Sequence, residues 1–355
     1  MVFSVFYKRC NMRKYLLPEG GTFYKANLHT HTIISDGKWT PEKVKEEYSE
    51  RGYSIVAFTD HDSLCPHNDL TDENFLAING FETYYNDEMF REMNYNFVKT
   101  YHLSFFAKDK DNLDCPAYSD DYVEYRHGLN YVPEDVVRYN YKRQHSVECI
   151  NRIIKQANKK GWLVSYNHPM WSLHNYEDYG KLEGLWGVEV YNTSAARGCM
   201  PDTAQAFYDF INQGKRIFPI CADDMHDYSG AFGGFVMIKA EKLEYSAVLS
   251  AMERGDFYSS SGPEIKDFYI EDGVLYVECT PAVKVYINTE RRDGWSCGSA
   301  DAPITKTSFD IRGYLSETEK EKERLNRDPY IRLSVVDKEG NVARTRAYFL
   351  SEFIE

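Results

Sequence analysis

Histidine and carboxylate side chains recur at short spacings along this chain, and both bind divalent cations. His29 and His31 are separated by one residue, so on a strand both imidazoles project from the same face and can reach one ion. Asp36 lies five residues beyond His31 in a Ser-Asp-Gly turn, and His61 stands at the end of an apolar run. Such nitrogen and oxygen donors suit zinc, manganese or iron. The pattern predicts a metal site.

Five further residues of the same types lie downstream. They are Glu82, His102, His168, Asp224 and His226, and each is predicted at or near the end of a strand. Together with the first four they make six of the ten histidines of the chain plus three carboxylates. A set of this size at strand ends predicts that one edge of the fold gathers metal ligands.

The elements that must position these side chains alternate between helix and strand. Short apolar runs predict strands that end in polar clusters, and they cover residues 54–58, 162–166, 187–191 and 216–222. Helical patterns precede three of them, at residues 40–52, 147–160 and 201–213, and the first has Thr40 as its N-cap and Pro41 at its first position. This alternation is typical of an α/β fold with parallel βα units, and a βα barrel gathers functional groups at the carboxyl ends of its strands.

Two parts of the chain depart from this alternation. The stretch from about 84 to 145 is rich in tyrosine and mixed charges, which indicates an insertion beside the site that could act as a lid. After Gly262-Pro263 the pattern predicts strands, including a hairpin with Asp272-Gly273 at its turn. We therefore expect an α/β domain over residues 1–262, which carries the candidate metal ligands, and a β-rich, sandwich-like domain over residues 263–355.

Length and charge narrow the possible partners. The 355 residues suit one large domain and a smaller one, and 42 basic against 55 acidic residues give a net charge of −13. This charge argues against binding a long nucleic acid, which requires basic residues on its phosphates. No apolar run is long enough to span a bilayer, and the first 17 residues lack a signal-peptide core, so we expect a cytoplasmic protein with no membrane partner. The eight cysteines form no Cys-x-x-Cys pair, which excludes a zinc ribbon.

The ordered motifs resemble those of the polymerase and histidinol phosphatase (PHP) domain phosphoesterases. The resemblance rests on HTHTIISDG at 29–37, FTDHD at 58–62, the spaced Glu82 and His102, NHP at 167–169 and DDMH at 223–226, and it covers roughly residues 25–263. It implies a distorted seven-stranded, TIM-like βα barrel that holds three divalent metal ions, either zinc, manganese or iron. The ligands that it implies are His29, His31, Asp36, His61, Glu82, His102, His168, Asp224 and His226.

The resemblance implies that the protein hydrolyses a small phosphomonoester through a metal-bridging hydroxide at a trinuclear centre. Three divalent ions, three carboxylates and one hydroxide leave a formal charge of about +2, which would attract a phosphate dianion on a small metabolite or nucleotide. The same ligands could instead serve hydrolysis of a cyclic phosphodiester, an ester or an amide. A metal-stabilised binding scaffold is the remaining alternative, and the sequence does not define the oligomeric state.

Residues outside the ligand set carry weaker expectations. Asp60 and Asp62 flank His61, and either could orient an imidazole or protonate the leaving oxygen, while a hydrogen-bonded aspartate at a strand end is an equal alternative. Arg197, in the loop after strand 187–191, could bind a phosphate or could simply be solvated. The inserted tyrosines could line a pocket for a nucleoside or sugar, or could pack the insertion onto the barrel.

Overall fold

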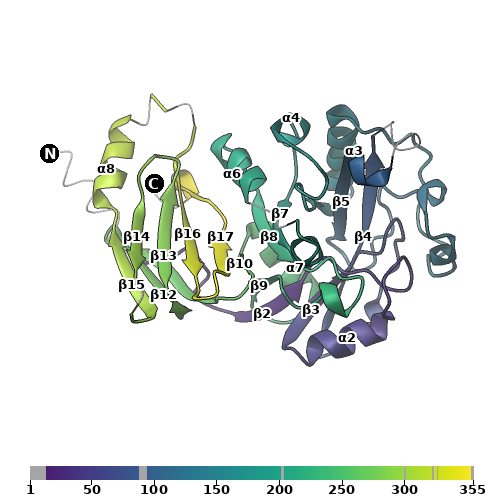
Figure 1. Cartoon of the computed structure of the whole chain (residues 1–355), viewed down its shortest axis with the longest axis horizontal. Coiled ribbons are helices and arrows are strands. Elements are labelled where there is room, and N and C mark those ends of the chain that lie inside the picture. The colour runs from purple at the N-terminus through teal and green to yellow at the C-terminus, as the bar shows by residue number, and fades with distance from the viewer. Residues whose placement is uncertain are drawn as a thin grey trace.

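A long mixed sheet forms the framework of the chain (Figure 1). The computed structural model describes residues 13–87, 94–200, 204–299, 301–321, 324–325 and 327–352. The α/β class is confirmed. Seven strands that carry the candidate site lie side by side in chain order: β2 (Thr22–Asn27), β3 (Tyr53–Phe58), β4 (Leu76–Asn86), β5 (Thr100–Ala107), β6 (Trp162–Tyr166), β7 (Gly187–Asn192) and β8 (Phe218–Ala222).

Strand direction places the polar strand ends at one edge of this sheet. The pairs β2/β3, β3/β4, β6/β7 and β7/β8 are parallel, whereas β5 runs antiparallel to both β4 and β6. His102 in β5 pairs with Tyr84 near the carboxyl end of β4, and Leu103 pairs with Tyr166 at the carboxyl end of β6. The first half of β5 therefore lies at the same edge as the carboxyl ends of its neighbours.

Six helices of this part of the chain are described, and most of them pack against a strand of the sheet. They are α2 (Pro41–Ser49), α3 (Val147–Lys159), α4 (Tyr176–Tyr179), α5 (Thr193–Arg197), α6 (Gln205–Asn212) and α7 (Tyr245–Arg254). The start of α2 is as predicted, because the Thr40 side chain accepts a hydrogen bond from the Lys43 amide and Val44 and Tyr48 are buried. The helix expected from residue 201 begins at Gln205, and residues 201–203 lie outside the described part.

Among the described residues, the hydrogen-bonded strands are not found to close into the expected seven-stranded barrel. β9 (Phe235–Ala240) pairs antiparallel with β2, and within the described residues the ladder of strands ends at β8. Side chains join the two ends instead, since Ile220 and Ala222 of β8 share a hydrophobic cluster with Val236 and Ile238 of β9. Contact between β8 and β9 thus rests on packing rather than on a backbone ladder, and a closed barrel is not confirmed.

The expected insertion at 84–145 contains more of the sheet than the sequence indicated. β4 extends to Asn86, and all of β5 is a buried strand of the sheet. Between β4 and β5 lies the 3₁₀ turn η3 (Tyr95–Phe97), and residues 88–93 of the expected insertion lie outside the described part. Residues 108–146 hold no α-helix or strand and have only the short 3₁₀ turns η4 (Asp120–Tyr122) and η5 (Arg126–Asn130). The inserted part is therefore the loop that joins β5 to α3.

The C-terminal part is rich in strands, as expected. It contains β10 (Phe257–Ser260), β11 (Ile265–Glu271), β12 (Val274–Ala282), β13 (Lys284–Thr289), β14 (Trp295–Gly298), β15 (Ile304–Asp310), β16 (Tyr330–Val336), β17 (Val342–Thr345), β18 (Tyr348–Phe349) and α8 (Arg312–Glu321). Asp272 and Gly273 both have positive φ at the tight turn between β11 and β12, as the hairpin dipeptide predicts.

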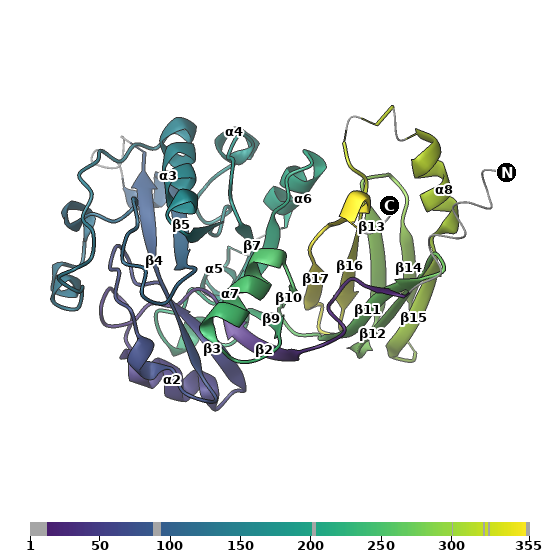
Figure 2. The ribbon, with the colours of Figure 1, turned by 180° about the vertical axis from the view of Figure 1, so that it is seen from behind.

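Two sheets face each other in this C-terminal part (Figure 2). β1 (Lys14–Tyr15), β11, β12 and β15 form a separate four-stranded sheet, while β13, β14, β16, β17 and β18 belong to the long sheet. Phe268 and Leu275 from the first sheet share a hydrophobic cluster with Val285 and Leu333 from the second. The domain boundary at 262/263 stays a prediction, because the long sheet runs on through β10 and β17.

The described residues also bear on membrane spans and on cysteine pairing. None of the described helices has the length and apolar character needed to cross a membrane. The seven cysteines in the described part are all free.

Candidate metal centre

All nine residues expected as metal ligands lie together at the polar edge of the sheet. His29, His31 and Asp36 follow β2, His61 follows β3, Glu82 and His102 lie within β4 and β5, His168 follows β6, and Asp224 and His226 follow β8. A cavity of about 410 Å³ opens over them, and seven of the nine line it. The other two, His29 and His31, are buried beneath it.

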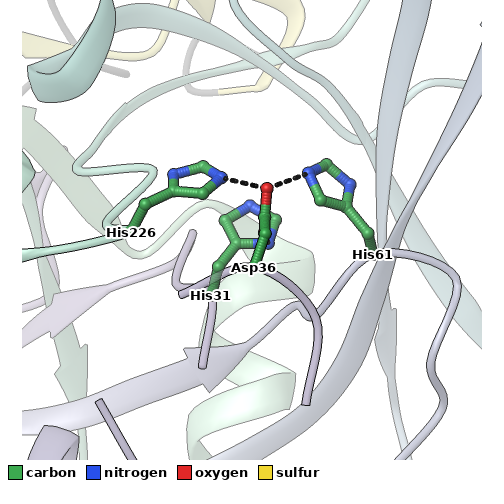
Figure 3. Close-up of side chains that lie close together, drawn as sticks. All are labelled: His31, Asp36, His61 and His226. Carbon is green, nitrogen blue, oxygen red and sulfur yellow. Dashed lines mark ion pairs between the residues drawn. The ribbon is translucent and has the colours of Figure 1, made fainter. Parts of the chain in front are cut away.

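Donor atoms of these residues, together with Glu189, form four overlapping groups, each compact enough to hold an ion. The groups are His31 with Asp36, His61 and His226; His29 with His31, Glu82 and Asp224; His29 with His168 and Glu189; and His61 with Glu82 and His102. Figure 3 shows the first group, in which the Asp36 carboxylate lies 3.3 Å from Nε2 of His226 and 3.9 Å from Nε2 of His61.

Several imidazoles are held so that one nitrogen faces the cluster. Nδ1 of His29 lies 2.7 Å from the Glu189 carboxylate, and Nδ1 of His226 lies 2.9 Å from the Asp224 carbonyl. Each of these rings directs Nε2 at neighbouring carboxylates, and Nε2 of His29 lies 3.1 Å from Nε2 of His31. Anchoring one ring nitrogen on an oxygen while the other points at the ion is the usual arrangement of metal-binding histidines.

Glu82 lies at the centre of the cluster. Its carboxylate is fully buried and lies 3.2 Å from nitrogens of His29, His61 and His102. The Asn167 amide donates to the same carboxylate at 2.7 Å. The Glu82 carboxylate therefore lies between three imidazoles that come from different segments of the chain.

Buried donor atoms without a hydrogen-bond partner show that these residues fit a metal. They are Oδ1 of Asp36, Nδ1 of His61, Oε2 of Glu82 and Nδ1 of His102. Nδ1 of His61 and Nδ1 of His102 each lie 3.2 Å from an oxygen of Glu82, but without the geometry of a hydrogen bond. An unsatisfied buried polar atom costs about 1–3 kcal/mol, so four in one cluster are costly unless another group completes them. All four belong to the groups that are compact enough for an ion. A divalent cation with nitrogen and oxygen ligands satisfies this requirement.

Burial and neighbouring charges shift the pKa values of several groups in the cluster. Burial opposes ionisation, yet Asp224, Glu82 and Glu189 raise the pKa of His29 well above its ordinary value. Against burial, His29 and its neighbours lower the pKa of Glu82 well below the usual range, and the same holds for Asp224. In contrast, burial and the adjacent His31 lower the pKa of His61 to about 3, which keeps its imidazole neutral. Ionised carboxylates and neutral imidazoles are the forms that bind metal, so a bound ion would have to displace the proton that the raised pKa of His29 retains.

Asp60 supports the loop that carries two expected ligands. Its buried carboxylate accepts hydrogen bonds from the backbone amides and hydroxyls of Thr32 and Ser35, at 2.7–3.2 Å. Its lone pairs are thus used to fix residues 31–36, and Asp60 does not line the cavity. The expectation that Asp60 protonates a leaving oxygen stays a prediction, and these contacts favour the orienting alternative.

The Asp62 carboxylate forms an ion pair with Arg143 of the insertion. Both of its oxygens accept from the Arg143 guanidinium, one of them at 3.0 Å, and the two side chains are 1% and 6% exposed. Burial raises the pKa of Asp62 to about 6, so it is ionised at neutral pH. Asp62 does not line the cavity. Its backbone has a positive φ of 50°, a conformation that Asp tolerates better than most residues.

Arg197 lies away from the cavity in this structure. It ends α5, and its guanidinium donates to the backbone carbonyl of Ser229. It is absent from the residues that line the cavity. The structure therefore does not bring Arg197 to the other expected site residues, and its role in binding substrate stays a prediction.

Sequence reasoning missed three residues that complete the site. Glu189 lies inside β7 and binds both Nδ1 of His29 and the amide of His168. Tyr125, from the insertion, donates to Asp36 at 3.1 Å. Arg143 holds Asp62, as described above. Of these three residues, only Glu189 could have been identified from the sequence, because it is a carboxylate within an otherwise apolar strand. The roles of Tyr125 and Arg143 depend on tertiary contacts.

Comparison with solved structures gives distant similarities. A two-domain protein from Bacteroides vulgatus, described as containing a predicted PHP-like metal-dependent phosphoesterase, is 13% identical, with 96% of this chain and 99% of that chain covered and a TM-score of 0.44. A putative metal-dependent phosphoesterase from Bifidobacterium adolescentis is 16% identical, with 60% and 90% covered and a TM-score of 0.36. A lesion-specific endonuclease from Pyrococcus furiosus is 17% identical, with 65% and 56% covered and a TM-score of 0.39.

Comparison with protein families finds a similarity for part of the chain. No curated protein matches it. The model of the PHP domain matches residues 27–154, which include six of the nine expected ligands. Residues 27–154 of this chain are therefore similar to the PHP domain.

Proposed function

We propose that this protein is a metal-dependent phosphoesterase that hydrolyses a small phosphomonoester. The observation that supports it most is the convergence of nine histidine and carboxylate side chains beneath one cavity, with four of their buried donor atoms unpartnered. The match of residues 27–154 to the PHP domain adds to this support, and similar structures are described as metal-dependent phosphoesterases.

The residues of the four groups would hold the ions. Divalent ions bound there would polarise a phosphoryl oxygen and lower the pKa of a water molecule from 15.7 to about 7. We propose three ions, zinc, manganese or iron, because the four groups share His29, His31, His61 and Glu82 and so merge into fewer sites. The shared residues would set the spacing between neighbouring ions.

Other residues of the chain orient the expected ligands, and the cavity limits the size of the substrate. Glu189 fixes the tautomer and angle of His29, Asn167 holds Glu82, and Tyr125 holds Asp36. The cavity is small enough for a metabolite and too small for a polymer duplex, which agrees with the net negative charge.

Phosphate release from purified protein tests this function. The protein is stripped with a chelator, reloaded separately with manganese, zinc or iron(II), and assayed against phosphomonoesters, a cyclic phosphodiester, carboxylic esters and amides. We expect metal-dependent release of phosphate from a monoester and at least a hundredfold loss of rate in Glu82→Gln. A matched control is Glu134→Gln, whose exposed side chain lies in the insertion away from the cavity.

Two other results of this assay would favour one of the alternative functions. Turnover of only the diester, ester or amide would contradict monoester hydrolysis while keeping the metal centre. Tight metal binding without turnover of any class would favour the binding scaffold.

A further inference from the structure

The end of β7 supplies none of the nine expected ligands, yet its side chains contact three of them. Glu189 and Asn192 are both buried there, at 2% and 0% exposed. The Glu189 carboxylate lies 2.7 Å from Nδ1 of His29 and accepts from the backbone amide of His168 at 2.9 Å. Asn192 donates to the third expected ligand, Asp224. These three ligands follow three different strands, so contacts from β7 join separate segments of the cluster.

The Asn192 side chain is fixed at both ends of its amide group. Its Oδ1 accepts from the backbone amide of Ala195 at 2.9 Å, which caps the amino end of α5. Its Nδ2 donates to Oε2 of Glu189 at 3.0 Å and to Oδ2 of Asp224 at 3.2 Å. A flipped amide would turn Oδ1 toward two carboxylates, which accept but do not donate when ionised. The cap on α5 therefore requires that the NH₂ group faces Glu189 and Asp224.

The bond from Asn192 determines which oxygen of Asp224 faces the imidazoles. Oδ2 accepts from the amide, whereas Oδ1 lies 3.2 Å from Nε2 of His29 and 3.0 Å from Nε2 of His31. The backbone of Asp224 is held as well, because its carbonyl accepts from the Ser194 hydroxyl at 2.7 Å. Rotation of the carboxylate is the freedom that remains, and the Asn192 amide restricts it.

We propose that Asn192 is a positioning residue of the metal centre. Its amide holds Asp224 with Oδ1 toward His29 and His31, and it joins this carboxylate to Glu189. Because the amide is neutral, it satisfies one oxygen of each carboxylate without adding charge to the cluster. The inference rests on the metal centre of the proposed function and assumes nothing about the substrate.

Manganese binding to an Asn192→Ser variant tests the inference. Serine keeps a capping oxygen for α5, but its shorter side chain cannot donate to both carboxylates. In chelator competition with full-length, metal-stripped protein, one equivalent of manganese should bind about 10–100-fold more weakly than in the wild type. The group that contains Asp36 includes neither Asp224 nor Glu189, so an ion held there should keep its affinity.

Two further readouts distinguish positioning from a general loss of structure. The visible absorption of cobalt(II) depends on the geometry of its ligands, so Asn192→Ser at saturating cobalt should give a changed spectrum. Asn192→Ala also removes the cap, so it should unfold at a lower urea concentration than Asn192→Ser while binding manganese equally weakly. Unchanged affinity and spectrum in Asn192→Ser, or equal weakening of every bound equivalent, would overturn the inference.

Asn175→Ser is the matched control. Asn175 also caps a short helix, since its side chain accepts from the Glu177 amide at 2.8 Å at the start of α4. It is exposed and does not line the cavity. This variant should therefore leave the manganese affinity and the cobalt spectrum as they are in the wild type, and the same loss in both serine variants would overturn the inference.

A crystal structure of the wild-type protein with manganese tests the inference without any variant. Asn192 should still donate to Oδ2 of Asp224, and Oδ1 should be the oxygen that faces the ion. Loss of the Asn192 contact, or manganese on Oδ2 instead of Oδ1, would overturn the inference.

The phosphate assay separates this inference from the proposed function. Weakened manganese binding in Asn192→Ser, with no phosphate release from any ester by the wild type, would reject the phosphatase function and retain the positioning role. Phosphate release by the wild type, with unchanged manganese binding in Asn192→Ser, would do the reverse. Failure of the wild type to bind manganese, zinc or iron(II) would overturn both.

Discussion

Replacing Arg143 with methionine should destabilise the protein far more than an ordinary loss of a surface charge. Arg143 is 6% exposed and its partner Asp62 is 1% exposed, so the substitution leaves a carboxylate buried without a counter-charge. Removing one member of a buried ion pair costs about 3–5 kcal/mol. Arg143 also donates to the carbonyl of Tyr84 at 3.2 Å and lies 4.2 Å from the centre of the Tyr122 ring. We therefore expect a loss near the upper end of that range.

A double-mutant cycle tests the reasoning directly. Asp62→Asn removes the charge while keeping a side chain that tolerates the positive φ at this position. The double variant should be more stable than the sum of the two single effects implies, by about 2 kcal/mol, because residues in direct contact couple by about 0.5–3 kcal/mol. Urea unfolding of the chelator-treated protein provides the free energies and excludes stabilisation by bound metal.

An exposed ion pair in the same insertion provides the control. Arg138 and Asp120 lie 2.9 Å apart and each side chain is 38% exposed, so Arg138→Met should cost no more than about 1 kcal/mol. Additive effects of the two substitutions at Arg143 and Asp62, or equal losses for Arg143→Met and Arg138→Met, would refute the reasoning.

Three further predictions concern the insertion, the cluster and the metal. A Cβ at Gly128 would lie 2.6 Å from the Ile34 carbonyl and 2.7 Å from the Ser63 hydroxyl, so Gly128→Ala should cost about 1–3 kcal/mol in urea unfolding, and an unchanged midpoint would argue against tight packing there. Glu189→Gln should weaken metal affinity about 10–100-fold in chelator competition, because it removes the anionic partner of His29; unchanged affinity would contradict that role. Adding divalent metal at a hundred times its Kd should stabilise the chelator-treated protein by about 2.7 kcal/mol and raise its Tm, whereas an unchanged Tm would contradict binding to the folded state.

The local elements were predictable because their signals are local. Thr40 and Pro41 mark the start of α2 through capping and a fixed φ, which need no distant partner. The Asp272-Gly273 turn was predictable for the same reason, since positive φ at both positions is a property of the dipeptide. The grouping of the nine expected ligands followed from their places at strand ends, and it agrees with their positions in the structure.

What the sequence did not reveal depends on contacts between distant segments. Arg143 and Asp62 are 81 residues apart, and nothing local to Arg143 distinguishes it from a solvated arginine. The sequence analysis assigned β5 to the tyrosine-rich insertion. All residues of β5 are buried, so its sequence lacks the alternation of polar and apolar residues that marks a half-exposed strand. Closure of the barrel depends on hydrogen bonds between β8 and a neighbour, which strand composition does not specify.

Location of the metal by anomalous scattering tests the central claim most directly. Crystals grown with manganese and measured at the manganese edge should show anomalous peaks among the donor atoms of His29, His31, Glu82 and Asp224 and of the adjoining groups. Peaks confined to other parts of the molecule, or none in the cavity at saturating manganese, would contradict the claim that these side chains form a metal centre.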